Sequence, residues 1–146
     1  MKRLLKIKIA AIAIVTLLSA AAIAEINTNS LKETQCLAMS IYYEAKGEPI
    51  KGQYAVADVV LNRVEDERFP DTICDVIYQK NQFHWKKAVP KPNLNWILAV
   101  RIANDVIKND SHRGITEGAV FFQRSSKIPV YADEKTTKIG NHNFFL

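Results

Sequence analysis

Ser40–Val56 reads SIYYEAKGEPIKGQYAV and holds a helix end, a tight turn and a helix start in one short segment. An apolar helical pattern runs into Glu44, is interrupted by Gly47 and Pro49, and resumes at once. Gly often follows the end of a helix, and Pro suits the first turn of the next one. The stretch therefore predicts two consecutive helices with a tight turn between them.

The first of these helices is predicted to run from Ser30 to about Lys46. Ser30 and Glu33 have the spacing of a capping box, in which each side chain satisfies a free backbone donor of the other residue. Leu37 and other apolar residues recur every three or four positions after this start. We therefore expect the folded domain to begin near Ser30.

Glu44 is the candidate catalytic residue of this helix. At ~100° per residue it lies about two turns after Leu37, at the end of the apolar strip. A carboxylic acid at the edge of an apolar surface loses solvation of its charged form, so its pKa rises and it can donate a proton near neutral pH. The alternative is an exposed helix end that pairs with Lys46 or Arg63.

A second carboxylate is not evident from the sequence. Glu48 follows Gly47 and precedes Pro49, where an exposed acid near a helix start is favoured by the helix dipole. We interpret Glu48 as such a charge. A hydrolase with two carboxylates needs the second at a set distance from the first, and the sequence leaves four candidates open: Asp58, Asp71, Asp75 and Asp133.

The rest of the chain is mostly helical, with a short extended part at its end. Helices are predicted over residues 50–66, 71–79 and 93–110 from their apolar periodicity and from capping residues such as Thr72. The segments EGAVFFQ, KIPVYA and KIGNHNFF are short and rich in β-branched or aromatic residues. We expect them to form a small antiparallel sheet or extended arms against the helices. The predicted fold is α+β, mainly α.

Residues 1–24 have the composition of an export signal. Lys2, Arg3, Lys6 and Lys8 precede an apolar run, and Ala22 and Ala24 have A-x-A spacing. We expect cleavage after Ala24, which leaves a short polar lead-in at residues 25–29 and one domain at residues 30–146. The alternative is an uncleaved membrane anchor.

The charge balance argues against nucleic acid as a partner. The four basic residues of the first segment account for most of the formal net charge of +5, so the remainder is near +1. A nucleic-acid site requires Lys and Arg clustered on the folded domain. We expect no nucleic-acid partner, a monomer, and a location in the periplasm or outside the cell.

Cys36 and Cys74 are the two cysteines of the chain. An exported protein meets an oxidising compartment, so a disulfide between them is the natural interpretation, with two reduced core cysteines as the alternative. No Cys/His grouping has metal-ligand spacing, and glycine patterns typical of phosphate or dinucleotide loops are absent. We therefore expect no metal and no cofactor.

Sugar-binding chemistry is present in the segment NQFHW. Gln82 and Phe83 combine an amide with an aromatic ring, a mixture that hydrogen-bonds to sugars and stacks on them. The alternative is an aromatic anchor of the core.

A long series of motifs resembles the cell wall hydrolase family that includes the catalytic domain of spore cortex-lytic enzymes. The series runs from CLAMSIYYEAKGEP through GQYAVADVVLNRV, FPDTICDVIY and QF, and KIGNHNFF is similar to the closing signature of the family. The resemblance covers residues 36–145. It implies a lysozyme-related fold, peptidoglycan as substrate, and Glu44 as the single catalytic glutamate.

The resemblance also implies a reaction and a set of substrate-binding residues. A lytic transglycosylase of this kind protonates the bond between N-acetylmuramic acid and N-acetylglucosamine and leaves a 1,6-anhydro end, whereas attack by water makes the enzyme a muramidase. The predicted substrate-binding residues are Gln82, Phe83, Phe122, Asn141 and His142.

Two departures from the family pattern concern one wall of the expected cleft. VFFQR stands where many relatives have a tyrosine and a histidine, and VYAD stands where a tryptophan is common. The competing interpretation is therefore a module of the same fold that binds peptidoglycan without cutting it.

Overall fold

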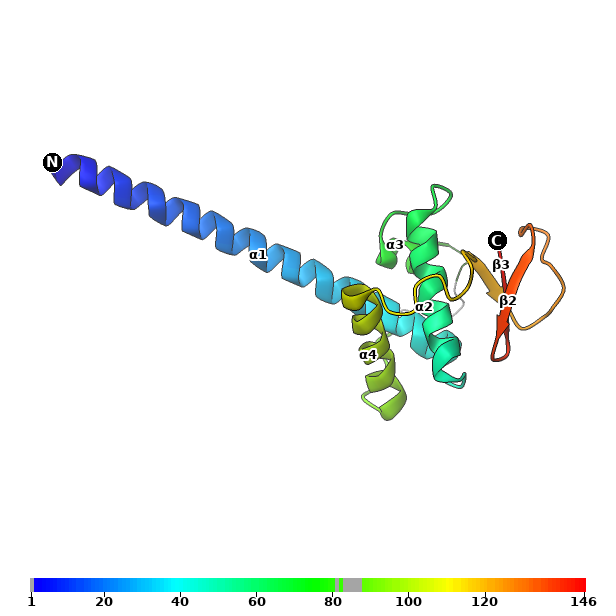
Figure 1. Cartoon of the computed structure of the whole chain (residues 1–146). Coiled ribbons are helices and arrows are strands. Elements are labelled where there is room, and N and C mark those ends of the chain that lie inside the picture. The colour runs from blue at the N-terminus through cyan, green and yellow to red at the C-terminus, as the bar shows by residue number, and fades with distance from the viewer. Residues whose placement is uncertain (1, 81, 83–87) are drawn as a thin grey trace. The chain divides into compact units, whose positions relative to one another are not determined.

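The computed structural model describes residues 2–80, 82 and 88–146, with side chains described from residue 22 onward. The chain divides into two compact units, Met1–Lys32 and Glu33–Leu146. The elements, shown in Figure 1, are α1 (Lys2–Ala45), α2 (Ile50–Glu65), α3 (Ile73–Tyr78), α4 (Leu94–Asn109), β1 (Phe121–Gln123), β2 (Lys135–Ile139) and β3 (His142–Phe145). The predicted class, α+β and mainly α with a small antiparallel sheet near the C-terminus, is confirmed.

The predicted helix start at Ser30 is wrong, because α1 continues through this residue from Lys2. The preceding residues 25–29 contain no Gly or Pro that would end a helix. The helix therefore continues through the capping sequence of Ser30 and Glu33. The Glu33 carboxylate accepts a hydrogen bond of 3.1 Å from the backbone N–H of Cys74.

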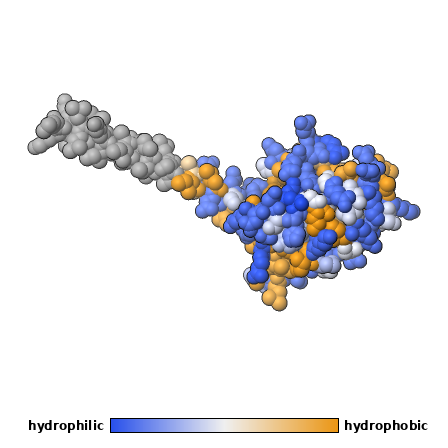
Figure 2. Space-filling view, in the orientation of Figure 1, coloured by the Kyte–Doolittle hydropathy of each residue, from blue (hydrophilic) through white to orange (hydrophobic). Residues whose placement is uncertain are grey.

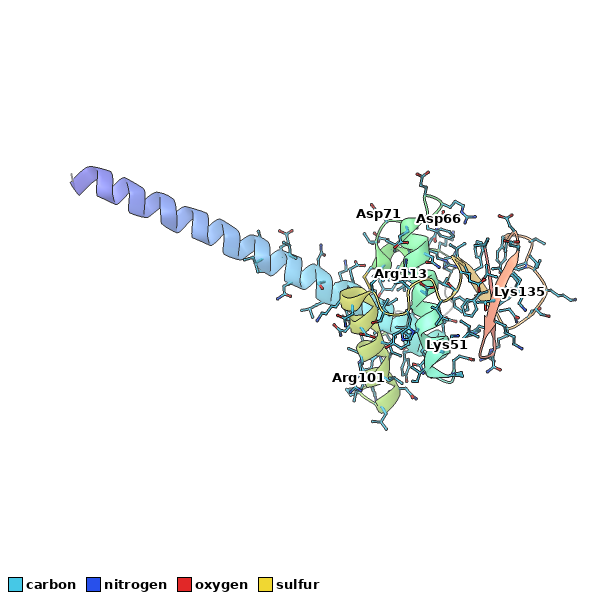
Figure 3. The ribbon with its side chains drawn as sticks, in the orientation of Figure 1. Lys51, Asp66, Asp71, Arg101, Arg113 and Lys135 are labelled. Carbon is cyan, nitrogen blue, oxygen red and sulfur yellow. A yellow bond between two sulfur atoms is a disulfide. The ribbon has the colours of Figure 1, made fainter. Side chains whose placement is uncertain are left out.

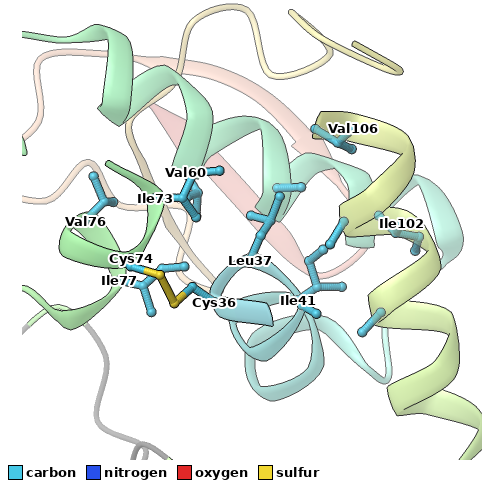
Figure 4. Packing of buried hydrophobic residues seen from close by; sticks show 14 residues of the cluster. Cys36, Leu37, Ile41, Val60, Ile73, Cys74, Val76, Ile77, Ile102 and Val106 are labelled. Carbon is cyan, nitrogen blue, oxygen red and sulfur yellow. A yellow bond between two sulfur atoms is a disulfide. The ribbon is translucent and has the colours of Figure 1, made fainter. Parts of the chain in front are cut away.

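The main core joins the last three turns of α1 to α2, α3 and α4 (Figure 4). Leu37 and Ile41 of α1 and Val60 of α2 are fully buried, as their periodicity predicts. The predicted disulfide between Cys36 and Cys74 is present and ties α1 to α3 within this core. The site-bearing end of α1 is therefore held by both packing and a covalent link.

The helix α2 is buried on two sides. Besides its predicted strip, Ala55 and Val59 pack against Ile139 and Phe144 of the sheet in a second apolar cluster. The strands pair in the order β1-β3-β2, all antiparallel, with one irregularity of register in β2 between Lys135 and Lys138. The helix α2 thus separates the helical core from the sheet.

The segment KIPVYA does not form the expected strand. Pro129 has no backbone donor for a sheet, and its carbonyl accepts a hydrogen bond of 3.1 Å from the N–H of Ala132 in a turn. The segment KIGNHNFF contains the end of β2, a two-residue turn and β3. The β part is therefore one hairpin with β1 added at its edge.

The surface of the unit Glu33–Leu146 is mostly hydrophilic in the view of Figure 2, with apolar residues among the polar ones. Within the part of the chain that the structure describes, no helical segment has the combination of length and hydropathy that a membrane crossing requires.

Candidate active site

Glu44 lies in the last turn of α1, one residue before the helix ends at Ala45. Leu37 and Ile41, earlier on the same strip, are fully buried, whereas Glu44 is partly exposed. The helical periodicity thus placed Glu44 correctly at the edge of the buried surface. Its catalytic role stays a prediction.

The two residues before Glu44, Tyr42 and Tyr43, contact α4 and the segment that precedes it. The Tyr43 hydroxyl donates a hydrogen bond of 2.8 Å to the carbonyl of Ala88. Tyr42 packs edge-on against Trp96, and Lys46 places its ammonium over the Tyr42 ring at 4.7 Å from the centroid. The last turn of α1 is therefore held on both sides of Glu44.

Glu48 is buried, which contradicts its predicted place as an exposed charge near the start of α2. Its carboxylate accepts two hydrogen bonds from Asn141, one of 2.8 Å from the backbone N–H and one of 3.1 Å from the side-chain amide. The amide of Gln53 donates to the Glu48 carbonyl at 3.2 Å. Glu48 thus clamps the turn after Glu44 to the turn of the β2–β3 hairpin.

This clamp sets the charge state of the carboxylate. Burial alone raises the pKa of Glu48, but the two hydrogen bonds from Asn141, together with the nearby His142 and Arg124, outweigh it and hold the pKa below its usual value. Glu48 is therefore ionised at neutral pH. It lacks the proton that a general acid must donate.

Gly140 allows the clamp to close. It has a φ of +58°, and a Cβ built on it would collide with the Glu48 carboxylate and lie 3.1 Å from Pro49 Cδ. Gly140 and Asn141 form the two-residue hairpin turn, in which a Gly at the first position is typical of type II′. A side chain at this position is disfavoured both by backbone conformation and by space.

His142 directly follows the turn and is almost completely buried. Its burial lowers the pKa of the imidazole, an effect that Arg124 strengthens and that the Glu48 carboxylate partly offsets. Its Nδ1 has no hydrogen-bond partner in the described part of the chain. Phe122 packs edge-on against the His142 ring, with centroids 5.1 Å apart.

Gln82 is tied to a buried arginine. The Gln82 side-chain oxygen accepts a hydrogen bond of 3.0 Å from Arg63, whose Nε also donates to the Val120 carbonyl at 2.6 Å. The Arg63 guanidinium lies over the rings of Phe69 and Phe121. Burial lowers the pKa of Arg63 to about 10, so it stays charged at neutral pH.

The structure thus brings three of the predicted binding residues, Phe122, Asn141 and His142, to the hairpin side of the site. Gln82 is bonded to Arg63, which also donates to the Val120 carbonyl just before β1. Phe83 lies outside the described residues. Asn141 donates one backbone and one side-chain hydrogen bond to Glu48, and His142 is buried, so the structure gives both residues contacts within the protein.

Two of the four aspartates considered as a second acid have structural roles. Asp58 is buried and accepts hydrogen bonds from Arg113, Gly114 and Thr116. Asp75 belongs to the cap of α3, where its carboxylate accepts a hydrogen bond from the Thr72 hydroxyl. Among the described residues, no group of three or more His, Cys, Asp or Glu could hold a metal ion.

The family model described as cell wall hydrolase matches residues 47–145, about two thirds of the chain. The chain belongs to the cell wall hydrolase family. The predicted family and class of enzyme are therefore confirmed. The match begins three residues after Glu44 and includes Glu48, Gly140 and Asn141, the residues of the clamp.

Named relatives of this cell wall hydrolase include spore cortex-lytic enzymes. That of Oceanobacillus iheyensis is 46% identical over 54 residues, which cover 37% of this chain and 20% of the relative. That of Bacillus subtilis is 41% identical over 54 residues, which cover 37% of this chain and 18% of the relative. The match thus spans about a fifth of the length of these relatives.

Two solved structures resemble almost the whole folded unit. The catalytic domain of the germination-specific lytic transglycosylase SleB from Bacillus anthracis is 28% identical, with a TM-score of 0.63 over 78% of this chain and 93% of that chain. The catalytic domain of the Bacillus cereus SleB protein is 30% identical, with a TM-score of 0.62 over 78% of this chain and 89% of that chain.

Sequence reasoning missed Glu48 and Gly140 as parts of the site. Both stood in motifs that the sequence analysis quoted, EAKGEP and KIGNH. What the sequence did not show is that the two motifs meet, since Glu48 and Asn141 are 93 positions apart.

Proposed function

We propose that this cell wall hydrolase is an exported lytic transglycosylase that cleaves the glycan strands of peptidoglycan, with Glu44 as its catalytic acid. The observation that carries the proposal is the similarity to a lytic transglycosylase catalytic domain over 93% of that domain. The position of Glu44 at the edge of the core supports its role, because a partly buried carboxylic acid is suited to donate a proton.

The proposed reaction uses Glu44 twice. It first protonates the oxygen that bridges N-acetylmuramic acid and N-acetylglucosamine, so that the bond to the anomeric carbon breaks. The resulting Glu44 carboxylate then accepts the proton of the 6-hydroxyl of the muramic acid, and that oxygen attacks the anomeric carbon. The products are a 1,6-anhydromuramic acid end and a free N-acetylglucosamine hydroxyl.

The clamp gives this mechanism a fixed geometry. Glu48, four residues after Glu44, is bonded to the hairpin turn, and Tyr43, just before it, is bonded to Ala88. A general acid must be held within hydrogen-bond reach of the oxygen that it protonates. The contacts on both sides of Glu44 restrict the movement of the backbone that carries it.

The test is digestion of purified sacculi followed by mass spectrometry of the soluble muropeptides. We expect the wild-type protein to release anhydro-muropeptides and Glu44→Gln to release none. Glu67→Gln, which removes an exposed carboxylate outside the site, is the matched control and should act like wild type. Products with reducing ends would make the protein a muramidase. Sedimentation with sacculi without release of products would make it a binding module.

Export is part of the same proposal. We infer that the chain is cleaved after Ala24 and acts in the periplasm or outside the cell, as a monomer and without a cofactor. The intact mass of the protein recovered from the envelope fraction should correspond to a chain that begins at Glu25. A mass that includes residues 1–24 would instead indicate a retained membrane anchor.

A further inference from the structure

One end of the sheet carries three exposed cations, Arg124, Lys127 and Lys138, which we call the basic edge. The register pairs both Gln123 and Lys138 with Asn143, so Arg124 follows at the end of β1 on the side of the hairpin turn. Two hydrogen bonds fix this end of the sheet. The Asn143 amide donates to the Arg124 carbonyl at 3.0 Å, and the Gln123 amide donates to the Lys127 carbonyl at 2.6 Å.

Within the described residues, none of the three side chains of the basic edge forms an ion pair. The nearby carboxylate of Glu48 is buried and already accepts two hydrogen bonds from Asn141. Arg124 is close enough to lower the pKa of both Glu48 and His142, which places its charge beside the clamp.

The basic edge is also near the proposed catalytic residue. The N–H of Glu48 donates to the Ala45 carbonyl at 2.9 Å, so the chain turns tightly just after Glu44. Four residues of fully extended chain span at most about 14 Å, and a tight turn spans less. Glu44 and Glu48, which forms the clamp beside the basic edge, are therefore at most about 14 Å apart.

The substrate proposed above carries negative charge close to the bond that is cut. A peptide stem is attached to each muramic acid, and its acidic residues and C-terminus are carboxylates. Arginine binds a carboxylate through two parallel hydrogen bonds, whereas lysine acts as a point charge. The basic edge thus offers a charge that is complementary to a stem carboxylate and lies near the clamp that follows Glu44.

We propose that the basic edge, with Arg124 as its main residue, binds a carboxylate of the peptide stem and makes the enzyme selective for strands whose stems are charged. This inference rests on the proposed function. Arg124 is here a specificity residue, because it contacts the stem and does not take part in the proton transfers.

The experiment compares two preparations of the same sacculi. In both, the stem amines are first acetylated. In one of them the carboxylates are then converted to methylamides with carbodiimide and methylamine, which removes the negative charge. We expect wild-type protein to release muropeptides about fivefold faster from the charged preparation, a ratio that corresponds to about 1 kcal/mol of an exposed ion pair.

Arg124→Gln should abolish this preference, so that its rate on both preparations matches the wild-type rate on the neutral one. The variant is expected to fold, since the side chain is exposed and the bond from Asn143 uses only the backbone carbonyl. Arg101→Gln is the matched control. It removes the same charge from an exposed position of α4, outside the sheet (Figure 3), and should keep the full preference.

Binding of Glu44→Gln to both preparations, measured by sedimentation, separates this inference from the proposed function. If Glu44→Gln prefers charged sacculi and Glu44→Gln/Arg124→Gln does not, while wild type cuts neither preparation, the proposed function fails. The binding of a stem carboxylate by the basic edge is then still supported. If wild type cuts both preparations at one rate, or Arg124→Gln keeps the wild-type preference, the inference is overturned and the proposed function stands.

Discussion

At the scale of single residues, Glu48 and His142 make stability depend on acidity. Burial lowers the pKa of His142 below 6.5, and the bonds from Asn141 overcome the effect of burial and hold the pKa of Glu48 below 4.5. Both groups bind a proton more tightly in the unfolded chain. The stability that each group contributes is therefore complete above its unfolded pKa and is lost as the pH falls through its folded pKa. Urea denaturation should show stability falling below about pH 6.5 and more steeply below about pH 4.5.

Glu48→Gln serves as the control for this pH profile. The variant keeps the size of the side chain but places an amide donor against the donors of Asn141. It should be less stable at neutral pH and should lose the steeper fall at low pH. An unchanged slope at low pH in Glu48→Gln would show that Glu48 is not the group responsible.

Gly140→Ala tests the close approach of the hairpin turn to Glu48. The positive φ of Gly140 and the collision of a new Cβ with the Glu48 carboxylate both oppose the substitution. We expect a loss of about 2 kcal/mol or more in the free energy of unfolding. Gly47→Ala is the control, because a Cβ there meets nothing within 4 Å, and its effect should stay within about 1 kcal/mol.

The residues of the site differ in how far local sequence determines them. Glu44 could be placed because its position follows from the helical period of its own segment, counted from Leu37. The burial of Glu48 could not, because it depends on Asn141, which is 93 positions away. By local rules an acid before Pro49 at a helix start is exposed, and only the tertiary contact reverses that expectation.

At the scale of elements, α2 was predicted to within one residue of its bounds but with only one of its buried faces. The strip of Val56 and Val60 was recognised, whereas Ala55 and Val59 have the same spacing one residue earlier and were not assigned to a face of their own. The sheet that covers them comes from the other end of the chain. A helix with two covered faces is therefore hard to recognise until its second partner is known.

The buried Asp58 holds the loop after α4 onto α2. Its carboxylate pairs with Arg113 at 2.6 Å and accepts bonds from Thr116 through both the backbone and the hydroxyl. Asp58→Ala leaves a mostly buried arginine and a buried threonine without this partner. We expect a loss of about 3–5 kcal/mol in the free energy of unfolding, measured by urea denaturation.

Asp71→Ala is the matched control for this experiment, since Asp71 is exposed. Its effect should stay within about 0.5 kcal/mol. A loss in Asp58→Ala no larger than that of Asp71→Ala would mean that the ion pair does not hold the loop in solution.

At the scale of the whole molecule, class and family were predictable, but the path of the chain at its two ends was not. The motif series and the helical periods extend over nearly all of residues 36–145, so many weak signals agree with one fold. At the N-terminus one helix runs through the capping signal of Ser30 and Glu33 because nothing before it breaks the helix. At the C-terminus the hairpin turn at Gly140 and Asn141 was not predicted within the segment KIGNHNFF.

The disulfide between Cys36 and Cys74 joins α1, which carries Glu44, to α3. It closes a loop of 38 positions, for which the chain-entropy estimate is about 4 kcal/mol of stabilisation. Reduction should therefore move the urea midpoint of the wild type to a much lower concentration. The double variant Cys36→Ser/Cys74→Ser should match the reduced wild type and should not respond to reductant. If thiol titration shows full reduction while the wild-type midpoint stays in place, packing alone holds α3 against α1.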